Sequence, residues 1–424
     1  MKVFKFGGAS VKDADSVRNV AAVLRHFPDD DLVIVVSAMG KTTNALEEVV
    51  GLSAQGRDAL PRVQELEDRH RAVLHAVAPH DAPARAALDQ RFAELRAVLA
   101  RPADAGPAGA GQDVDRHYDG IVAFGELWST LIVSAHLNAA GIANQWLDAR
   151  RIITTDARHR AANVQWDVLA ANCAAHMPAF DRRPHRTVTQ GFIGRTAQGE
   201  TTTLGREGSD FSAAIFAYAL DATSVTIWKD VPGMFNADPN RFPDTRLLER
   251  ISYKEAIELS YFGASVIHPR TLQPLQRKGI PLYVRSFMDL GAPGTLISAA
   301  TDHDTLVPSF IVKPHQLLIS ITPRDLSFIV EEHLGDIFAL FAARRVRIDL
   351  MQNSAVAFTV AVDDTPRARA LVGELQGRYE VRYNAGCELL TVRHFDEPAL
   401  AALTTGRRVL VEQRSRTTAR YVLK

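Results

Sequence analysis

Residues 201–214 read TTTLGREGSDFSAA and place an arginine, a glutamate, a serine and an aspartate in one glycine-bounded loop. The apolar run 211–220 predicts a helix, and Ser209 or Asp210 before it is an N-cap signal, because such side-chain oxygens satisfy free backbone N–H groups. Those N–H groups and the helix dipole attract anions, and Arg206 can hold a carboxylate or phosphate with two parallel hydrogen bonds. The loop is therefore suited to bring an anionic ligand, an arginine and a carboxylate together. A plain helix cap after a glycine turn would have the same pattern.

The N-terminus has a second pattern of this kind. Residues 2–6 predict a short apolar strand, Gly7 and Gly8 break it, and residues 13–27 have helical periodicity. A strand, a Gly-Gly pair and a helix point backbone N–H groups at a phosphate, and Lys5 adds a positive charge beside them. The stretch is neither a Walker A loop nor a GxGxxG fingerprint. An ordinary turn after a strand would read the same way.

Two more places are candidates for walls of a site. Residues 37–44 (SAMGKTTN) follow the continuous apolar strand 31–36, and ligands of open α/β sheets bind beyond the carboxyl ends of strands. A solvent-exposed turn is the alternative interpretation. Glu126 opens the helix expected at 127–140, where it is either a surface charge that complements the helix dipole or a ligand for a substrate ammonium group.

Composition bounds the class of protein. The chain has 424 residues, enough for two domains, and its 49 Lys and Arg balance its 49 Asp and Glu. No net field therefore favours nucleic acid or an anionic membrane. The two cysteines, Cys173 and Cys387, lie far apart, which argues for a reducing compartment and against a disulfide framework or a zinc site. The N-terminus lacks a signal-peptide h-region and the apolar runs are short, so we expect a soluble cytoplasmic protein.

The elements that must position these loops alternate between strands and helices over the first 290 residues. Further strands are expected at 142–147, 186–193, 224–230 and 281–287, and further helices at 62–100 and 253–262. This alternation predicts an α/β fold with a mostly parallel open sheet sandwiched by helices.

The pattern changes after the GAPG stretch at 291–294. From residue 315 the expected order is βαββαβ, which is a ferredoxin-like unit, and a strand, a short helix and two strands follow as an abbreviated second copy. We place the boundary near 298–312. The predicted organisation is one domain at 1–300 and a second region at 312–424, with modules at 315–384 and 385–424.

Five motifs, taken together, resemble the aspartokinase branch of the amino acid kinase family. They appear in the family's order and span most of the first 300 residues, and the tail resembles the paired ACT regulatory modules of the same enzymes. In this sequence the motifs are KFGGAS (5–10), FGELWS (124–129), TLGREGSD (203–210), WKDVPGMFNADPN (228–240) and FGASVIHPRT (262–271).

The resemblance implies Mg-ATP-dependent phosphorylation of the side-chain carboxylate of L-aspartate. The product would be 4-phospho-L-aspartate, an acyl phosphate that enters lysine, threonine and methionine synthesis. An aspartate carboxylate, with a pKa near ~3.9, is already an anion at neutral pH and needs no general base. Because an anion must approach a polyphosphate, catalysis should consist of positioning and charge neutralisation.

The resemblance also assigns residues. Lys5 would neutralise the transferred phosphoryl group, and Asp210 would hold that lysine and the metal nucleotide in place. Arg206 would grip a substrate carboxylate, and Glu126 would take the α-ammonium group. The other expected residues are Thr43 and Ser209 in the substrate pocket, Gly7 and Gly8 at the phosphates, and Lys229, Asp230, Phe235, Asn240, Arg241 and Ser265 along the nucleotide. ATP would carry the Mg²⁺, with no protein side chain as a ligand of the metal.

At four positions of the family motifs this chain has a residue other than the usual one. Ala9 replaces the usual threonine, and Ser265 stands where many members have a lysine near the nucleotide. Glu207 replaces a glycine and would repel phosphate unless it is turned outward. Lys229 replaces a common threonine, and we hypothesise that its added charge offsets Glu207.

The tail implies regulation. ACT modules of this family pair between chains and bind an end-product amino acid, so we expect a homodimer and a lysine or threonine effector. Asp349 and Ser354 match the effector pocket, although either could be a turn residue. Two rival functions stay open: an amino acid kinase that acts on another small acid, and a catalytically silent amino-acid sensor.

Overall fold

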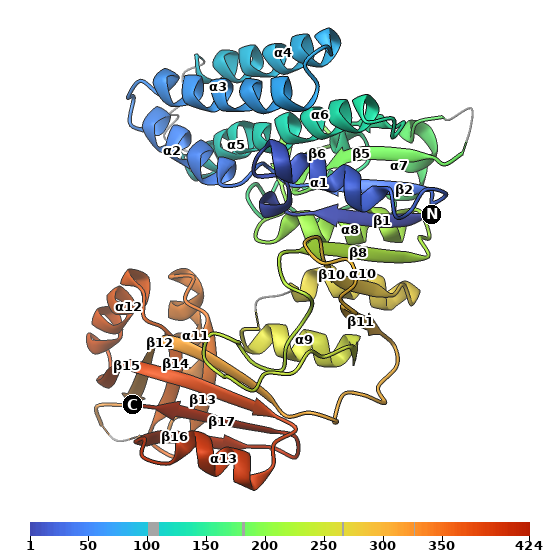
Figure 1. Ribbon diagram of the computed structural model, residues 1–424. Coiled ribbons are helices and arrows are strands. Elements are labelled where there is room, and N and C mark those ends of the chain that lie inside the picture. The colour runs from blue at the N-terminus through green and yellow to red at the C-terminus, as the bar shows by residue number, and fades with distance from the viewer. Residues whose placement is uncertain (101–109, 180–182, 265–266, 326) are drawn as a thin grey trace. The chain divides into compact units, whose positions relative to one another are not determined.

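The computed structural model describes residues 1–424 except 101–109, 180–182, 265–266 and 326, and no side chain is described at 110–113. Contacts divide the chain into two compact units (Figure 1). The first unit comprises Met1–Met234, Leu247–Ile257 and Val266–His303, and the second comprises Phe235–Arg246, Glu258–Ser265 and Asp304–Lys424.

The first unit is built on a sheet of eight described strands in the order β3-β5-β2-β1-β8-β10-β11-β9. Every neighbouring pair is parallel except the antiparallel pair β10–β11. The sequence LVIVV of β2 is buried throughout because both faces of the central sheet are covered. The bounds are β1 Lys2–Phe6, β2 Leu32–Val36, β3 Gln145–Leu147, β5 Arg186–Gln190, β8 Ser224–Lys229, β9 Arg250–Ser252, β10 Leu282–Ser286 and β11 Thr295–Ser298.

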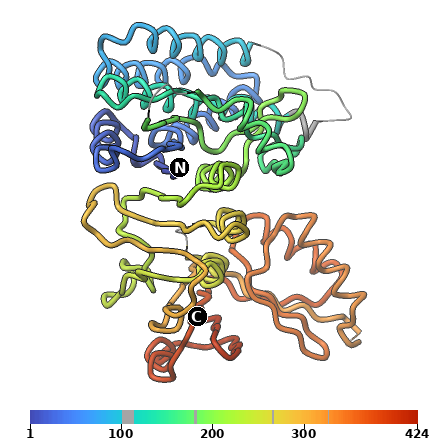
Figure 2. The backbone as a smooth tube through the Cα atoms, turned by 90° about the vertical axis from the view of Figure 1, so that its right-hand side faces the viewer, coloured from blue at the N-terminus to red at the C-terminus, as the bar shows by residue number. Residues whose placement is uncertain are grey.

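Helices flank this sheet. Helix α8 packs against β1, β2 and β8, and α6 packs against β2, β3 and β5. Figures 1 and 2 show α3, α4 and α6 running side by side as one helical layer. The bounds are α1 Ala14–Leu24, α2 Thr42–Ala54, α3 Leu60–Val77, α4 Ala82–Leu99, α5 Ala110–Val122, α6 Phe124–Ala139, α7 Leu169–His176, α8 Gly208–Ala219, α9 Tyr253–Phe262 and α10 Pro269–Lys278. A small sheet contains β4 Thr154–Thr155, β6 Ile193–Thr196 and β7 Thr201–Thr203.

One helical stretch among the described residues, Val114–Ala139, is long and apolar enough to cross a membrane by length and composition. Its most apolar window is 89% buried inside the protein, which is the behaviour of a core helix. This helix carries Glu126, so its burial brings a carboxylate into the interior of the first unit.

The second unit is an antiparallel sheet in the order β13-β14-β12-β15-β17-β16. Strands β12 and β15 have 14 residues each and pair from Ser309↔Arg393 to Thr322↔Glu380. The bounds are β12 Ser309–Thr322, β13 Ile348–Asn353, β14 Phe358–Asp363, β15 Glu380–Arg393, β16 Val409–Arg414, β17 Thr418–Leu423, α11 Glu331–Ala343, α12 Pro366–Gln376 and α13 Glu397–Thr404.

Each of the two long strands serves two cores. Leu317, Ile319 and Ile321 of β12 belong to the core that contains residues of α11 and α12. Phe310 and Val312, on the same strand, pack with Leu400 of α13. The two modules therefore form one continuous sheet. The expected boundary interval 298–312 overlaps the start of β12, and the exact domain limits stay a prediction.

The predicted fold class is confirmed. A large parallel sheet is flanked by helices in the first unit, and the C-terminal unit is an antiparallel α/β sheet with the order β12, α11, β13, β14, α12, β15. The alternation of strands and helices in the sequence was sufficient to predict both architectures.

Candidate active site

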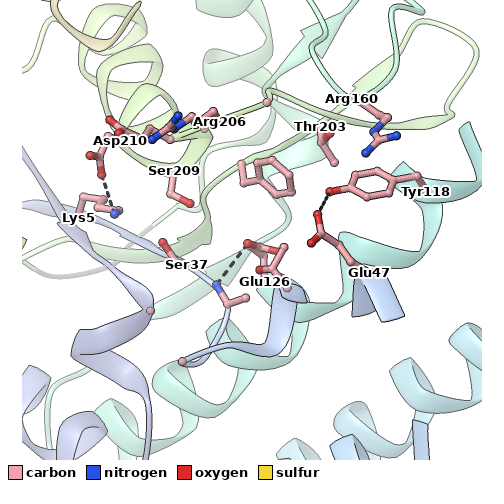
Figure 3. A pocket seen from close by; sticks show the side chains of 18 of the residues that line it. Lys5, Ser37, Glu47, Tyr118, Glu126, Arg160, Thr203, Arg206, Ser209 and Asp210 are labelled. Carbon is pink, nitrogen blue, oxygen red and sulfur yellow. Dashed lines mark hydrogen bonds and ion pairs between the residues drawn. The ribbon is translucent and has the colours of Figure 1, made fainter. Parts of the chain in front are cut away.

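A cavity of about 600 Å³ lies in the first unit (Figure 3). Its walls come from β1, from the loop that follows β2, from α2, α5 and α6, and from the loop that leads from β7 into α8. The loop 37–44, expected as a candidate wall, contributes Ser37, Ala38, Gly40 and Thr43. Because β1, β2 and β8 are parallel neighbours, their carboxyl ends meet at the same edge of the sheet.

Lys5 and Asp210 meet in this cavity. The Lys5 Nζ atom lies 2.6 Å from Asp210 Oδ1, and the two side chains are 10% and 4% exposed. The Lys229 Nζ atom lies 3.7 Å from the other carboxylate oxygen, Oδ2. Burial alone would raise the pKa of the Asp210 carboxyl, but Lys5 and then Lys229 hold that pKa below its usual value. Asp210 is thus a buried carboxylate that orients two ammonium groups toward the cavity.

The helix after this loop begins earlier than the sequence predicts. The expected N-cap at Ser209 or Asp210 is wrong: α8 starts at Gly208, and the residue before it, Glu207, has φ 55° and makes no side-chain cap. A Cβ on Gly208 would lie 2.7 Å from the ring of Phe192, so this close approach requires glycine. Asp210 consequently sits in the first turn, where its carboxylate faces Lys5 and also complements the helix dipole.

The glycine at position 8 permits the two N-terminal loops to touch. A Cβ there would lie 2.8 Å from the carbonyl oxygen of Ala38 and 2.9 Å from that of Gly40. The amide of Gly40 donates a 3.0 Å hydrogen bond to the carbonyl of Gly8. Gly8 lines the cavity beside Lys5, which is the arrangement of backbone and charge that a phosphate requires.

Glu126 is a buried carboxyl group at the cavity wall. It is 3% exposed, and its Oε1 accepts a 3.3 Å hydrogen bond from the amide of Ala38. Its Oε2 has no hydrogen-bond partner among the described residues. Burial raises the pKa of this carboxyl from its ordinary value near 4.5 to about 8. A cationic group in the cavity would stabilise the carboxylate form and pair with the open oxygen.

Arg206, Ser209 and Thr43 line the same cavity as Lys5 and Glu126. Figure 3 shows Ser209 beside Arg206 and the Lys5–Asp210 pair, with Ser37 and Glu126 across from it. The predicted catalytic and substrate-binding residues therefore share one site. Their individual roles stay predictions.

The residues expected along the nucleotide do not all lie in the unit that contains the cavity. Lys229 lines the cavity, and Asp230 follows it as an exposed residue. Phe235, Asn240 and Arg241 belong to the second unit, where Arg241 pairs with Glu388 at 3.1 Å and the Asn240 amide donates to Asp238 at 3.0 Å. Ser265 lies outside the described residues. Gly7 is not among the residues that line the cavity, although a Cβ there would be 3.4 Å from Lys5 Nζ.

The far end of the cavity was missed by the sequence analysis. The Tyr118 hydroxyl donates a 2.6 Å hydrogen bond to Glu47 Oε1, and the Arg160 guanidinium lies 4.0 Å from the centroid of the Tyr118 ring. Thr203 lies beside them (Figure 3), and Phe192 also lines the cavity. No spacing in the sequence links these residues, because they come from α2, α5, β7 and two loops.

The predicted effector residues lie in the second unit. The Asp349 carboxylate is 4% exposed and lies 2.5 Å from Lys313 Nζ, which also contacts Asp363 at 3.2 Å. The Ser354 hydroxyl is close to Ala357 in the turn after β13. Asp349 is therefore paired with a lysine of its own chain, and the Ser354 side chain stabilises a turn.

Comparisons with known proteins show the family of this chain. The model of the amino acid kinase family matches residues 1–286. Lysine-sensitive aspartokinase 3 of Escherichia coli K12 is 32% identical over 401 residues, which cover 92% of this chain and 86% of that protein. The crystal structure of E. coli aspartokinase III in complex with aspartate and ADP superposes with a TM-score of 0.81 at 26% identity, covering 100% of this chain and 96% of that one.

A bifunctional aspartokinase/homoserine dehydrogenase 1 of Zea mays, described as chloroplastic, is 35% identical over 300 residues. The match covers 70% of this chain and 32% of the plant protein, so the chain spans about a third of the length of that bifunctional relative. The match of the family model over residues 1–286 and the near full-length similarity to the E. coli protein lead to one conclusion. This chain belongs to the amino acid kinase family, in its aspartokinase branch.

Proposed function

We propose that the protein is an aspartate kinase, which transfers a phosphoryl group from ATP to the side-chain carboxylate of L-aspartate. The product, 4-phospho-L-aspartate, would enter lysine, threonine and methionine biosynthesis. The observation that carries the proposal is one cavity with opposite charges at separate places: the ammonium groups of Lys5 and Lys229 beside Asp210, and the open carboxyl oxygen of Glu126. The related E. coli enzyme was crystallised with aspartate and ADP.

The cavity suits the reaction because its charges oppose the main barrier. The attacking carboxylate is an anion at neutral pH and approaches a polyphosphate, so repulsion must be reduced. Lys5 would neutralise the transferred group, and Asp210 would hold the Lys5 ammonium in place. Lys229 would add a second positive charge at the nucleotide phosphates. Preorganised charges of this kind cost no rearrangement when the reaction occurs.

The residues around Lys5 fit a nucleoside triphosphate in this part of the cavity. Gly8 allows the backbone to approach a phosphate closely, and the ammonium groups of Lys5 and Lys229 face the same space. We propose that Mg²⁺ enters with ATP and neutralises further phosphate charge. Phe235, Asn240, Arg241, Asp230 and Ser265 remain proposed nucleotide contacts on the basis of the family resemblance alone.

Aspartate itself would be held by its three ionic groups. Arg206 would bind its α-carboxylate and Glu126 its α-ammonium group, while Ser209 and Thr43 would complete the pocket. The remaining carboxylate would then point toward Lys5. A pocket with one acidic and one basic anchor selects a small zwitterion with an additional acid group.

A hydroxylamine trap tests the proposal. The purified protein is incubated with ATP, Mg²⁺ and aspartate, and the acyl phosphate is captured as aspartyl hydroxamate. Arg206→Gln should raise the KM for aspartate at least tenfold, because a charge-assisted bidentate hydrogen bond is lost. Trapping with glutamate in place of aspartate would show a kinase for another acid. Binding of amino acids without any turnover would show a silent sensor.

We further propose that lysine or threonine binds the second unit as an effector. The support is the similarity to the lysine-sensitive aspartokinase 3 of E. coli, and an effector ammonium group at Asp349 would have to compete with Lys313 for this carboxylate. Titration of activity and melting temperature with each amino acid tests this. The absence of any shift with both would remove the effector proposal.

A homodimer is proposed through the same unit. Strand β13 pairs with β14 and is an edge of the described sheet, and Met351 on it is 53% exposed. Phe338 on α11 is 41% exposed. Sedimentation of the wild type and of Phe338→Glu measures the assembly: a monomeric wild type would refute the dimer. A cytoplasmic location stays a prediction from the sequence.

A further inference from the structure

Two segments from different parts of the chain form one wall of the cavity. Residues 158–162 lie against residues 203–205: the amide of Ala162 donates a 3.0 Å hydrogen bond to the carbonyl of Thr203. Gly205 has φ 78°, and a Cβ there would lie 3.1 Å from the carbonyl oxygen of Arg160. Arg206 follows this contact directly, so the position of its backbone depends on how the two segments are held together.

A buried carboxylate fastens the two segments from one side. Asp119 on α5 is fully buried. Its oxygens accept hydrogen bonds from the amide of Arg160 at 3.0 Å, from the amide of Thr203 at 3.0 Å and from the hydroxyl of Thr203 at 2.6 Å. The His159 Nδ1 atom lies 3.0 Å from the same carboxylate. Asp119 does not line the cavity, but Arg160 and Thr203 do.

A guanidinium group fastens the same segments through their carbonyl groups. Arg270 on α10 donates to the carbonyl of Leu204 at 3.0 Å and to the carbonyl of Ala162 at 3.4 Å. Its guanidinium lies 4.8 Å from the centroid of the Phe211 ring on α8. Asp119 thus accepts from N–H groups of both segments, and Arg270 donates to C=O groups of both.

Backbone strain indicates that this clamp is needed. Arg160 adopts φ 65° and Glu207 φ 55°, and both line the cavity on either side of the clamped contact. Left-handed backbone costs a residue other than glycine about 1 kcal/mol or more and persists only where surrounding contacts impose it. The hydrogen bond from the Arg160 amide to Asp119 is such a contact.

We propose that Asp119 and Arg270 are positioning residues, which together hold the 203–206 loop so that Arg206 can grip the substrate carboxylate. This inference rests on the proposed binding of aspartate by Arg206. Neither residue touches the substrate. Both act through the backbone of the two wall segments, one through its donors and the other through its acceptors.

The test compares the effect of each substitution on the KM for aspartate with its effect on the KM for ATP. In Asp119→Asn the amide cannot accept from all of these donors, because its NH₂ group must face one of them. The KM for aspartate should rise at least tenfold, while the KM for ATP stays within twofold. Arg270→Met should raise the KM for aspartate about fivefold, and Arg270→Lys should restore part of this loss. Equal KM changes for both substrates, or a KM for aspartate within twofold of the wild type, would overturn the proposal.

Glu67→Gln is the matched control. Glu67 is also a buried carboxylate, paired with Arg71 and Arg96, and it does not line the cavity. Its loss should lower the melting temperature without a selective change in the KM for aspartate. If Asp119→Asn does not fold, Thr203→Val decides: it removes the 2.6 Å hydroxyl hydrogen bond and keeps the side-chain shape. It should raise the KM for aspartate about threefold, and an unchanged KM would count against the clamp.

Hydrogen exchange makes the outcome independent of the proposed activity. In Arg270→Met and Asp119→Asn the amides of 158–162 and 203–208 should exchange at least tenfold faster than in the wild type, with the central sheet unchanged. If the wild type does not phosphorylate aspartate, the proposed function fails, yet faster exchange at these amides would still support the clamp. Unchanged exchange there would refute the clamp even in an active kinase.

Discussion

Two lysine–aspartate pairs with nearly the same geometry occur in the two units. Lys5 and Asp210 are 2.6 Å apart in the first unit, Lys313 and Asp349 are 2.5 Å apart in the second, and each aspartate side chain is 4% exposed. Their surroundings differ. The first pair faces a cavity and has a second ammonium group at 3.7 Å, whereas the Lys313 ammonium is shared with a second carboxylate at 3.2 Å.

This difference shows how the same pair can serve different ends. Asp210 is one carboxylate beside two ammonium groups at the cavity wall, an arrangement that can attract a phosphate. Lys313 is one ammonium group between the carboxylates of Asp349 on β13 and Asp363 on β14, so it fastens neighbouring strands of an antiparallel sheet. Local charge balance, and not the pairing itself, separates a site for an anion from a structural pair.

The largest expected effect tests the first pair. Lys5→Met should lower kcat about 10³-fold, because a preorganised positive charge at the transferred phosphoryl group is lost. Asp210→Asn should give a similar loss, since the Lys5 ammonium is no longer oriented. Steady-state kinetics with hydroxamate detection measures both. A kcat within tenfold of the wild type in both variants would remove the catalytic role of the pair.

The second prediction concerns Glu126 on the cavity wall. The Glu126 carboxyl has a pKa of about 8, so binding an ammonium group below that pH must release a proton. The KM for aspartate should therefore fall about tenfold per pH unit from pH 6 to pH 8 and level off above it. Glu126→Gln should raise the KM about 10²-fold and abolish this slope. A wild-type KM that is flat with pH would exclude Glu126 as the ammonium ligand.

The same group affects stability without substrate. The folded pKa is raised above the unfolded value near 4.5, so the stabilisation is complete below pH 4.5 and is lost as the pH rises toward 8. The melting temperature of the wild type should therefore fall as the pH rises from 4.5 to 8, and this pH dependence should be absent in Glu126→Gln. Thermal melts of both proteins across this range measure it.

The third prediction breaks the second pair. Lys313→Met should destabilise the second unit by about 2 kcal/mol, because a buried carboxylate loses its closest cation, although Arg347 lies 3.9 Å from Asp349. Basal kcat should stay within twofold of the wild type. Urea unfolding and kinetics check both statements. Loss of turnover together with stability would show that the two pairs are not functionally separate.

The smallest effect is expected at Glu207 and Lys229, two positions of the first unit that differ from the family pattern. If Lys229 offsets the charge of Glu207, then Glu207→Gly should raise kcat more in a Lys229→Thr background than in the wild type, by about threefold. A double-mutant cycle measures this coupling. Equal increases in the two backgrounds would end the compensation hypothesis.

Local patterns in the sequence were enough to predict the fold and several of the loops that line the cavity. The apolar strand 31–36, the glycines after Phe6 and the helix after the 201–214 loop each follow from short-range rules of burial, turn geometry and helix periodicity. Glu126 was singled out with two interpretations. Its burial rules out the surface charge, and its role as a ligand for an ammonium group stays a prediction.

The sequence by itself determined which loops carry charged residues and that strands and helices alternate around them, because these properties depend on neighbours in the chain. Only the tertiary structure decided that α8 begins at Gly208, that Asp119 and Arg270 hold one wall, and that Lys313 holds Asp349. Those outcomes depend on contacts between residues far apart in sequence. Such contacts are set by the packing of whole elements, which no local spacing records.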